Sequence, residues 1–337
     1  MIRLVTKEFS QQDWTDIVSG FTDLNLIQTW EYGEAKARTG PWKVARAVLM
    51  DGSEVLAACQ SMVRPLPFLG GGLVWINRGP LWRRQDKGDL TVLIKMLGEL
   101  RRYWVEERRM YLRLAPPVYQ EEAGAALFAS YGYKVVTTAS GWASARIDLT
   151  RPTEELRRNL QQKWRNCLNK AERLNLTCES GTGDQVFRQV LEEYEEMLRQ
   201  KKLKGSASPS LLSRLQAYLE EDRKLWGFLG WQGDQRLGGV LIARYGRTCE
   251  YLVGAFNQKG RDVNAGNLLI WQAICKMKEL GYRWFDLGGM HPIITKPGVL
   301  HFKSGLGGKF YQLHDKLESY HPGLVNRLLR WCIRRGQ

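Results

Sequence analysis

The chain has 337 residues, with 50 lysines and arginines against 35 aspartates and glutamates, which gives a formal charge of +15. This length exceeds what one hydrophobic core usually supports, so we expect two domains. So large a charge raises the local concentration of polyanions, and the candidate partners are nucleic acid, pyrophosphate-bearing substrates and anionic lipid. A basic protein without a specific anionic ligand is equally compatible with the composition alone.

The six cysteines are scattered without a Cys-x-x-Cys pair, so the sequence indicates neither a zinc site nor a disulfide framework. The N-terminus is charged where a secretory signal has an apolar segment, and no window is apolar over a membrane-spanning length. We therefore expect a cytoplasmic protein with reduced thiols and no bound metal. At most it would touch the inner face of the membrane.

Turn signals and apolar runs in the first half predict a simple order of elements. A turn at 51–54 leads into a strand over 55–60, a second strand covers 72–77, a helix runs from 90 to 109 and a strand follows at 110–114. This half therefore reads as hairpin, helix and strand.

The second half repeats that order. A turn at 232–235 opens a strand over 237–243, which pairs with a strand over 248–253, and a helix at 267–280 precedes a strand at 282–286. Two copies predict a duplicated mixed α+β module. The boundary is expected at 148–152, where a strand gives way to a helix with Pro152 at its start and two glutamates in its first turn.

The helix expected after this boundary has two kinds of surface. Its apolar residues recur at helical spacing and predict one buried stripe, made of Leu156, Leu160, Trp164, Leu168 and Ala171. Its cations lie seven residues apart on neighbouring exposed faces, as the pairs Arg158 with Arg165 and Lys163 with Lys170. A solvated charged face is the ordinary explanation, and an anion-binding face is the alternative.

A glycine-rich segment near the end of the chain is the clearest candidate for chemistry. The strand ending in Asp286 runs into a glycine turn, and residues 301–308 then present Lys303 on a loop between Phe302 and several glycines. Glycines let a second backbone or a phosphate come close. No serine elbow, histidine-based zinc helix or phosphate-loop fingerprint accompanies this segment, which disfavours hydrolysis by a triad.

Four segments resemble, in order and spacing, motifs of the Fem family of peptidoglycan bridge-forming aminoacyltransferases. They are Gln28-Thr29-Trp30 with Lys36, Asn77-Arg78-Gly79-Pro80, Lys163-Trp164-Arg165, and the Phe-Lys-x-Gly-x-Gly run from Phe302. Members of that family move an amino acid from aminoacyl-tRNA to the stem peptide of a cell-wall precursor.

The resemblance implies two tandem GNAT-like domains, each a mixed sheet flanked by helices, with a central cleft. We expect these domains at 1–148 and 149–317, with the segment from about 318 to 337 packing back on the first. The implied partners are aminoacyl-tRNA, as co-substrate in place of a cofactor, and a UDP-linked or lipid-linked muropeptide precursor. We expect a monomer.

Roles for individual residues follow from the same resemblance. Lys303 would face the oxyanion or hold the terminal tRNA phosphate, with Phe302 as a packing or stacking wall, because aminoacyl transfer needs proximity and oxyanion stabilisation rather than a protein nucleophile. A surface lysine beside a structural glycine turn is the alternative. Lys36, in the segment of Trp30, would contact the precursor pyrophosphate, and Arg78 would face the cleft.

The remaining candidates belong to the second module and its flanks. Lys163 and Arg165 would form an anion or substrate face. Tyr251 and Asp286 should point into one crevice, where Asp286 either orients the attacking amine or caps the glycine turn. A basic residue of the cluster 199–204 is expected to contact phosphate.

One position departs from the family pattern. Ala115 stands where relatives commonly place an acidic residue before a proline. If that carboxylate normally reads the stem peptide of the acceptor, an alanine implies a different acceptor or a different reading group.

Two other functions compete with this one. An acyl-CoA-dependent GNAT enzyme needs a glycine-rich turn opening a helix, and the segment 261–266 stands there with Asn264 where glycine is usual. A non-catalytic tRNA- or membrane-binding protein would explain the charge. The stretch 322–335, apolar on one side and arginine-rich on the other, could lie on an anionic membrane or dock on the protein.

Overall fold

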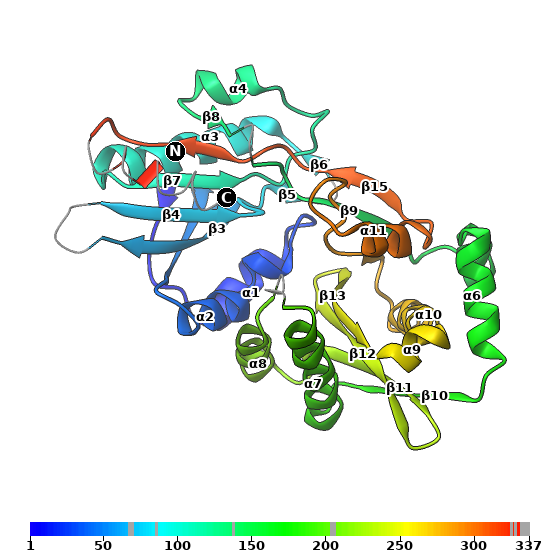
Figure 1. Cartoon of the computed structure of the whole chain (residues 1–337). Helices are drawn as coiled ribbons and strands as arrows, with labels where there is room; N and C mark the ends of the chain where they lie inside the picture. The colour runs from blue at the N-terminus through cyan, green and yellow to red at the C-terminus, as the bar shows by residue number, and fades with distance from the viewer. Residues whose placement is uncertain are drawn as a thin grey trace. The chain divides into compact units, whose positions relative to one another are not determined.

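The computed structural model describes residues 1–66, 71–84, 87–136, 139–202, 207–323, 326 and 329–330 (Figure 1). The chain forms two compact units, one made of Met1–Trp142 with Gln312–Gln337 and the other of Ala143–Tyr311. Within the described ranges, no helix is long and apolar enough to cross a membrane.

The first unit is built on a seven-stranded mixed sheet with the order β1-β2-β3-β4-β7-β16-β8. Its strands are β1 (Ile2–Val5), β2 (Lys43–Asp51), β3 (Glu54–Pro65), β4 (Gly72–Asn77), β7 (Tyr111–Ala115), β8 (Lys134–Val135) and β16 (Leu317–Ser319), and β5 (Arg83–Arg84) with β6 (Lys87–Gly88) forms a small separate ribbon. Strands β4 and β7 are parallel, and the other neighbouring strands of this sheet pair antiparallel.

Its helices are α1 (Gln11–Ser19), α2 (Trp30–Arg38), α3 (Leu90–Arg101) and α4 (Ala125–Ser130), with a 3-10 turn at Leu26–Gln28. The predicted helix at 90–109 continues beyond α3 as a π-helical turn, Arg102–Glu107. Leu93, Leu97 and Leu100 of α3 are fully buried against Leu112 and Leu114 of the sheet. This spacing of leucines is why α3 covers the sheet.

The second unit is built on another seven-stranded mixed sheet, with the order β10-β11-β12-β13-β14-β9-β15. Its strands are β9 (Ala143–Asp148), β10 (Leu176–Gly181), β11 (Trp226–Gln232), β12 (Gln235–Tyr245), β13 (Thr248–Phe256), β14 (Trp284–Asp286) and β15 (Lys309–Gln312). Its helices are α5 (Thr153–Asn159), α6 (Gln162–Glu172), α7 (Asp184–Gln200), α8 (Pro209–Tyr218), α9 (Gln258–Asp262), α10 (Ala265–Glu279) and α11 (Pro297–Ser304). The predicted mixed α+β class is therefore confirmed.

The two sheets are arranged alike, but each takes its sixth strand from elsewhere in the chain. In both, the fourth and fifth strands are parallel, namely β4 with β7 and β13 with β14. The sixth strand of the second sheet is β9, which precedes the rest of that unit, and Figure 1 shows it in green beside the late strand β15 in orange. The sixth strand of the first sheet is β16, which follows the whole second unit.

This exchange places the division of the chain before β9. Residues 143–148 are expected in the first domain, whereas the structure pairs Arg146 with Asp286 and Asp148 with Trp284 in the second sheet. Strand pairing of this kind joins residues far apart in sequence, so composition near residue 148 does not reveal it.

The charged helix expected after the boundary is two helices, so the prediction of one continuous helix is wrong. Leu160 is extended, with φ −62° and ψ 136°, and the backbone N–H of Gln161 donates to the carbonyl of Gly305 at 2.9 Å. A bond outside the helix thus replaces an intrahelical one. All five apolar residues of the predicted stripe are nevertheless buried.

Because β16 completes the first sheet, truncating its buried Leu317 is expected to destabilise that unit. We predict that Leu317→Ala lowers the free energy of unfolding by about 2–5 kcal/mol through lost burial and a cavity. Urea unfolding followed by circular dichroism would measure it, with Val299→Ala, at a 44% exposed position, as the control. A loss below about 1 kcal/mol would show that β16 contributes little to this core.

Candidate functional site in the second unit

The structure places Phe302 and Lys303 in helix α11, not in the loop that the sequence predicted. Pro297 starts this helix, because its fixed φ and missing N–H suit the first helical position. Gly305 ends it, and the glycine run that suggested a loop lies just beyond the lysine. A helix fixes the direction of the lysine side chain more firmly than a loop would.

Lys303 is the central cation of the site. Its side chain is only 8% exposed, its Nζ donates to the carbonyl of Gly289 at 3.1 Å and lies 5.1 Å from the ring centroid of Tyr251. Burial lowers the pKa of Lys303 to about 8, while the carboxylates of Asp286 and Glu250 oppose this shift. Near neutral pH the group is therefore a largely protonated ammonium in a dry environment.

Asp286, at the end of β14, is 1% exposed and fully engaged. It accepts hydrogen bonds from the hydroxyls of Ser144 (2.5 Å) and Tyr311 (2.6 Å), from Nε of Arg146 (3.2 Å) and from the backbone of Gly288 (2.9 Å). Burial alone would raise the pKa of Asp286, but Arg146 and these hydrogen bonds hold it below its usual value. Asp286 thus caps the glycine turn and keeps a negative charge near Lys303.

Sequence reasoning missed three residues of this cluster: Ser144, Arg146 and Tyr311. Ser144 and Arg146 alternate along β9, so they share a face, and the register sets Arg146 opposite Asp286. The alternation of Ser144 and Arg146 is visible in the sequence. It points to Asp286 only when the pairing of β9 with β14 is known.

The Lys-Trp-Arg segment and the Phe-Lys-Gly segment pack against each other. The rings of Trp164 and Phe302 lie 5.8 Å apart between centroids, and a Cβ at Gly305 would come within 2.5 Å of Trp164. Gly307 has φ +73°, and a Cβ there would lie 2.3 Å from the backbone oxygen of Asn159. The two motifs form one packed structure, which explains why glycines follow the lysine.

The two cations of the Lys-Trp-Arg segment differ in their surroundings. Lys163 is exposed, whereas Arg165 is half-buried and donates to the backbone oxygen of Arg158 at 3.1 Å. Lys163 is therefore available to an external anion, and Arg165 supports the junction between α5 and α6.

The candidates of the first unit also gather around two motifs. The side chain of Gln28 donates to the backbone oxygens of Asn77 (2.9 Å) and Gln60 (3.2 Å), which ties the Gln-Thr-Trp segment to the Arg-Gly-Pro turn. Arg78 is 6% exposed, with its guanidinium 4.5 Å from the ring centroid of Trp142. Arg78 is thus part of a packed turn.

Trp30 and Lys36 lie on helix α2, and both are half-buried. The guanidinium of Arg46, which sequence reasoning did not single out, stacks 3.5 Å from the ring centroid of Trp30 and pairs with Glu34 at 3.0 Å. Arg46 therefore fixes the tryptophan. Of the basic cluster at 199–204, Arg199 pairs with Glu196, and residues 203 and 204 lie outside the described ranges.

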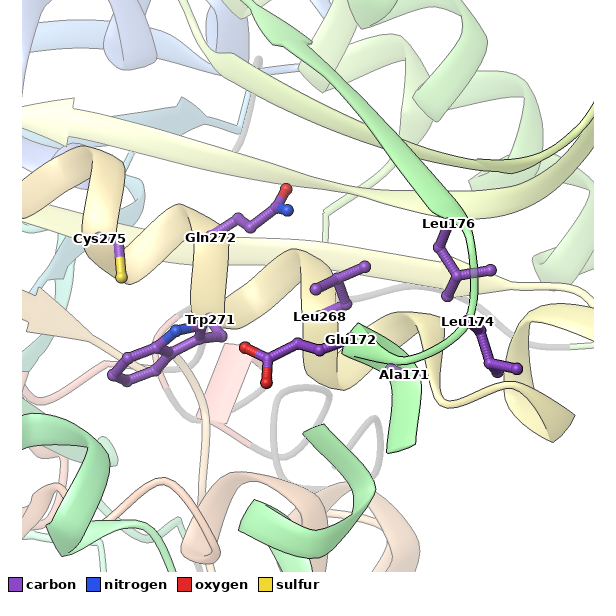
Figure 2. A pocket seen from close by; sticks show the side chains of 8 residues that line it. All are labelled: Ala171, Glu172, Leu174, Leu176, Leu268, Trp271, Gln272 and Cys275. Carbon is purple, nitrogen blue, oxygen red and sulfur yellow. The ribbon is translucent and has the colours of Figure 1, made fainter. Parts of the chain in front are cut away.

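A separate pocket of about 360 Å³ opens in the second unit between the end of α6, β10 and α10. Figure 2 shows Glu172 and Gln272 among apolar side chains that include Trp271. Arg157 binds the Glu172 carboxylate at 2.8 Å, and none of the predicted site residues lines this pocket. In the described part of the chain, no group of three or more histidines, cysteines or carboxylates could hold a metal ion.

Comparison with known proteins places this geometry in a class. Residues 154–304 match the family model of the acetyltransferase (GNAT) domain, and a comparison with curated protein sequences gives no match. The second unit therefore contains a GNAT-type acyltransferase domain.

The whole chain has solved structural neighbours. The crystal structure of FemX matches 98% of this chain and 99% of its own, with a TM-score of 0.78 and 16% sequence identity. The C-terminal domain of a putative lysylphosphatidylglycerol synthetase from Agrobacterium fabrum matches 96% of each chain, with a TM-score of 0.54 and 15% identity. A tandem GNAT protein from the clavulanic acid biosynthesis pathway matches 96% of this chain and 100% of its own, with a TM-score of 0.54 and 11% identity.

The chain therefore has a tandem GNAT-like fold, which is similar to that of FemX over nearly the full length of both proteins. The Fem-type architecture that the motifs predicted is confirmed at the level of the fold.

The close packing around Gly307 leaves no room for a larger side chain, which can be tested. Gly307→Ala should lower the free energy of unfolding by more than about 2 kcal/mol, because its Cβ would meet a backbone oxygen at an unfavourable positive φ. Gly298→Ala, in helix α11 with open space around its Cβ, is the matched control and should not destabilise. Denaturant unfolding of both variants measures the difference, and equal stabilities would refute the close packing.

The negative charge of Asp286 should raise the pKa of Lys303, which can be measured. In Asp286→Asn the opposing carboxylate is lost, so the pKa of Lys303 should fall below its value of about 8. NMR titration of lysine labelled at Cε would follow it, with Asp262→Asn, an exposed carboxylate on α9, as the control. An unchanged or higher pKa in Asp286→Asn would mean that the two groups do not interact.

Proposed function

We propose that this protein transfers an amino acid from aminoacyl-tRNA to an amine on the stem peptide of a peptidoglycan precursor. The proposal is supported by the four motifs in register and by the fold shared with FemX. The observation that carries it is the Lys303 ammonium, buried at the carboxyl end of β14 and aligned by the Gly289 carbonyl.

The chemistry requires little more than such a cation and correct positioning. The acceptor amine attacks the ester carbonyl of the aminoacyl-tRNA, the new C–N bond forms, the ester C–O bond breaks, and the ribose oxygen leaves with the proton that the amine gives up. The intermediate carries an oxyanion. A buried ammonium stabilises it more than an exposed one, because little water screens the charge.

The other residues are proposed to hold the substrates. Lys36, Trp30 and Arg78 would bind the precursor, which is UDP-linked or lipid-linked, and Lys163 would meet the tRNA. Asp286 acts as a positioning residue, since its oxygens are already engaged, and Tyr251 forms a wall beside Lys303.

The other candidate residues of the second unit have different roles in this proposal. Arg165 already donates to the backbone oxygen of Arg158, so in this proposal it holds α5 against α6 while Lys163 meets the anion. Phe302 would hold α11 against Trp164 rather than react. Aminoacyl-tRNA is a co-substrate, and the proposal needs no further cofactor; a monomer acting in the cytoplasm fits it.

Replacing the lysine tests the proposal. Lys303→Met should lower the single-turnover rate of transfer by about 10²–10³-fold at saturating aminoacyl-tRNA, as loss of an oxyanion-stabilising group does. The assay incubates the protein with charged tRNAs and wall precursors and follows the amino acid onto the peptide. Lys309→Met, an exposed lysine on β15, is the control. Near-normal transfer by Lys303→Met would refute the assignment.

An acyl-CoA-dependent GNAT enzyme is the second candidate, and one observation favours it. Asn264, which replaces the usual glycine before α10, has φ +56° and ψ 34°, the left-handed conformation that glycine adopts readily. The turn therefore keeps its backbone shape without glycine. Calorimetry with acetyl-CoA discriminates the two candidates, since the proposed aminoacyltransferase should not bind it.

A protein that only binds tRNA or membrane would bind aminoacyl-tRNA and never consume it, so the transfer assay also decides this third alternative. Much of the C-terminal stretch expected to touch a membrane lies outside the described residues. Membrane contact stays a hypothesis.

A further inference from the structure

The pocket at the end of helix α6 has no part in the transfer proposed above. Its volume of about 360 Å³ falls within the range of small-ligand sites. The apolar stripe of α6 packs on α10, and the chain then passes through Leu174 into β10, so the pocket lies between these three elements of the second unit (Figure 2). It is therefore a cavity with defined walls whose use is open.

The interior of this pocket is largely apolar and has no unbalanced charge. Leu174, Leu176 and Leu268 supply aliphatic walls. Glu172 is the one charged side chain among the lining residues, and both terminal nitrogens of Arg157 donate to its carboxylate, at 2.8 and 2.5 Å. These hydrogen bonds hold the pKa of Glu172 below its usual value, so the carboxylate is ionised and Arg157 balances it. A charged ligand group would find no unpaired opposite charge inside.

One polar side chain of the pocket is available to a ligand. Gln272, on α10, lines the pocket next to Trp271, and its amide makes no hydrogen bond to any residue that the structure describes (Figure 2). A glutamine amide offers donors and an acceptor side by side. The pocket therefore suits a flat ligand whose faces contact the leucines and whose edge carries both donors and acceptors.

Two exposed cations stand beside this pocket. Lys170 and Arg173 flank the lining residues Ala171 and Glu172, and their spacing of three puts them on one side of α6. Neither forms an ion pair with a residue in the described ranges. Cations at a helix C-terminus also complement the helix dipole, so their presence alone does not indicate a ligand. The pocket is the second, independent observation, because it places apolar and amide contacts next to two unpaired positive charges.

We propose that this pocket binds one unstacked nucleotide, with the base between the leucines and against Gln272, and the phosphate at Lys170 and Arg173. A nucleobase is flat, uncharged at neutral pH and edged with donors and acceptors, and glutamine amides pair with such edges. A free amino acid would bring two charges into a pocket without unpaired charges, and an alkyl chain would leave the amide without a partner. The inference rests on the proposed function for the source of the nucleotide, which is then an unpaired position of the tRNA.

Alkylation of Cys275 gives a readout in the pocket itself, because this half-buried thiol lines it. A short single-stranded RNA at about ten times its Kd should slow the reaction of Cys275 with iodoacetamide about tenfold, since only the free protein reacts. Double-stranded RNA of the same length should give no protection, because its bases are paired and stacked. Cys167, half-buried on α6 and outside the pocket, is the internal reference, and mass spectrometry follows both thiols.

Two variants separate the contact to the base from the contact to the phosphate. Gln272→Met keeps the side-chain length and loses the amide, so it should raise the Kd of single-stranded RNA about fivefold, the effect of losing one hydrogen-bonding group. Lys170→Met should weaken binding to every RNA sequence alike and reduce its salt dependence. Arg214→Met, an exposed cation on α8, is the matched control, and fluorescence anisotropy measures each Kd.

The common nucleoside 5′-monophosphates distinguish the two sources of a nucleotide. Protection of Cys275 by RNA alone assigns the pocket to a nucleotide within a chain, and protection by a monophosphate at the same concentration assigns it to a free nucleotide. No protection by either, or equal protection by double-stranded RNA, overturns the proposal. An RNA affinity that Lys170→Met lowers and Gln272→Met leaves unchanged also overturns it, because only a basic surface then remains. Failure of the proposed function shows separately, as protected Cys275 in a protein that transfers no amino acid.

Discussion

The candidate site depends on holding one ammonium group out of water. An isolated buried cation is costly, and Lys303 meets this cost with a backbone carbonyl, an aromatic ring and the field of two carboxylates. Asp286 can supply its share only because Ser144, Arg146 and Tyr311 keep it ionised. The arrangement is therefore nested, with β9 and β15 supporting β14, and β14 supporting the helix that carries the lysine.

Local sequence predicted the elements and the motifs well. The duplicated order of hairpin, helix and strand appears in both units, and the apolar stripe predicted from Leu156 to Ala171 is buried in the structure. These features depend on neighbours within a few turns, which periodicity reports directly. The motif residues were found because their types and spacing are distinctive.

What the sequence did not reveal depends on contacts between distant segments. The break at Leu160 accompanies a hydrogen bond from Gln161 to Gly305, and two partners of Asp286, Ser144 and Arg146, lie 142 and 140 positions earlier in the chain. Lys303 was assigned to a loop because the glycines after it dominated the local signal, while Pro297 began a helix before it. Arg46 could not be predicted, because a single arginine in a strand shows no sequence pattern and its contact with Trp30 exists only in the folded chain.

The positions of β9 and β16 in the two sheets also determine which sheet can be completed first during synthesis. During synthesis the second unit has all seven strands once residue 312 has left the ribosome, while the first sheet still has a gap between β7 and β8. That gap closes only when Leu317–Ser319 emerge. The sheet whose strands are made first is thus completed after the other one, and the edges of β7 and β8 stay unpaired until Leu317–Ser319 have been made.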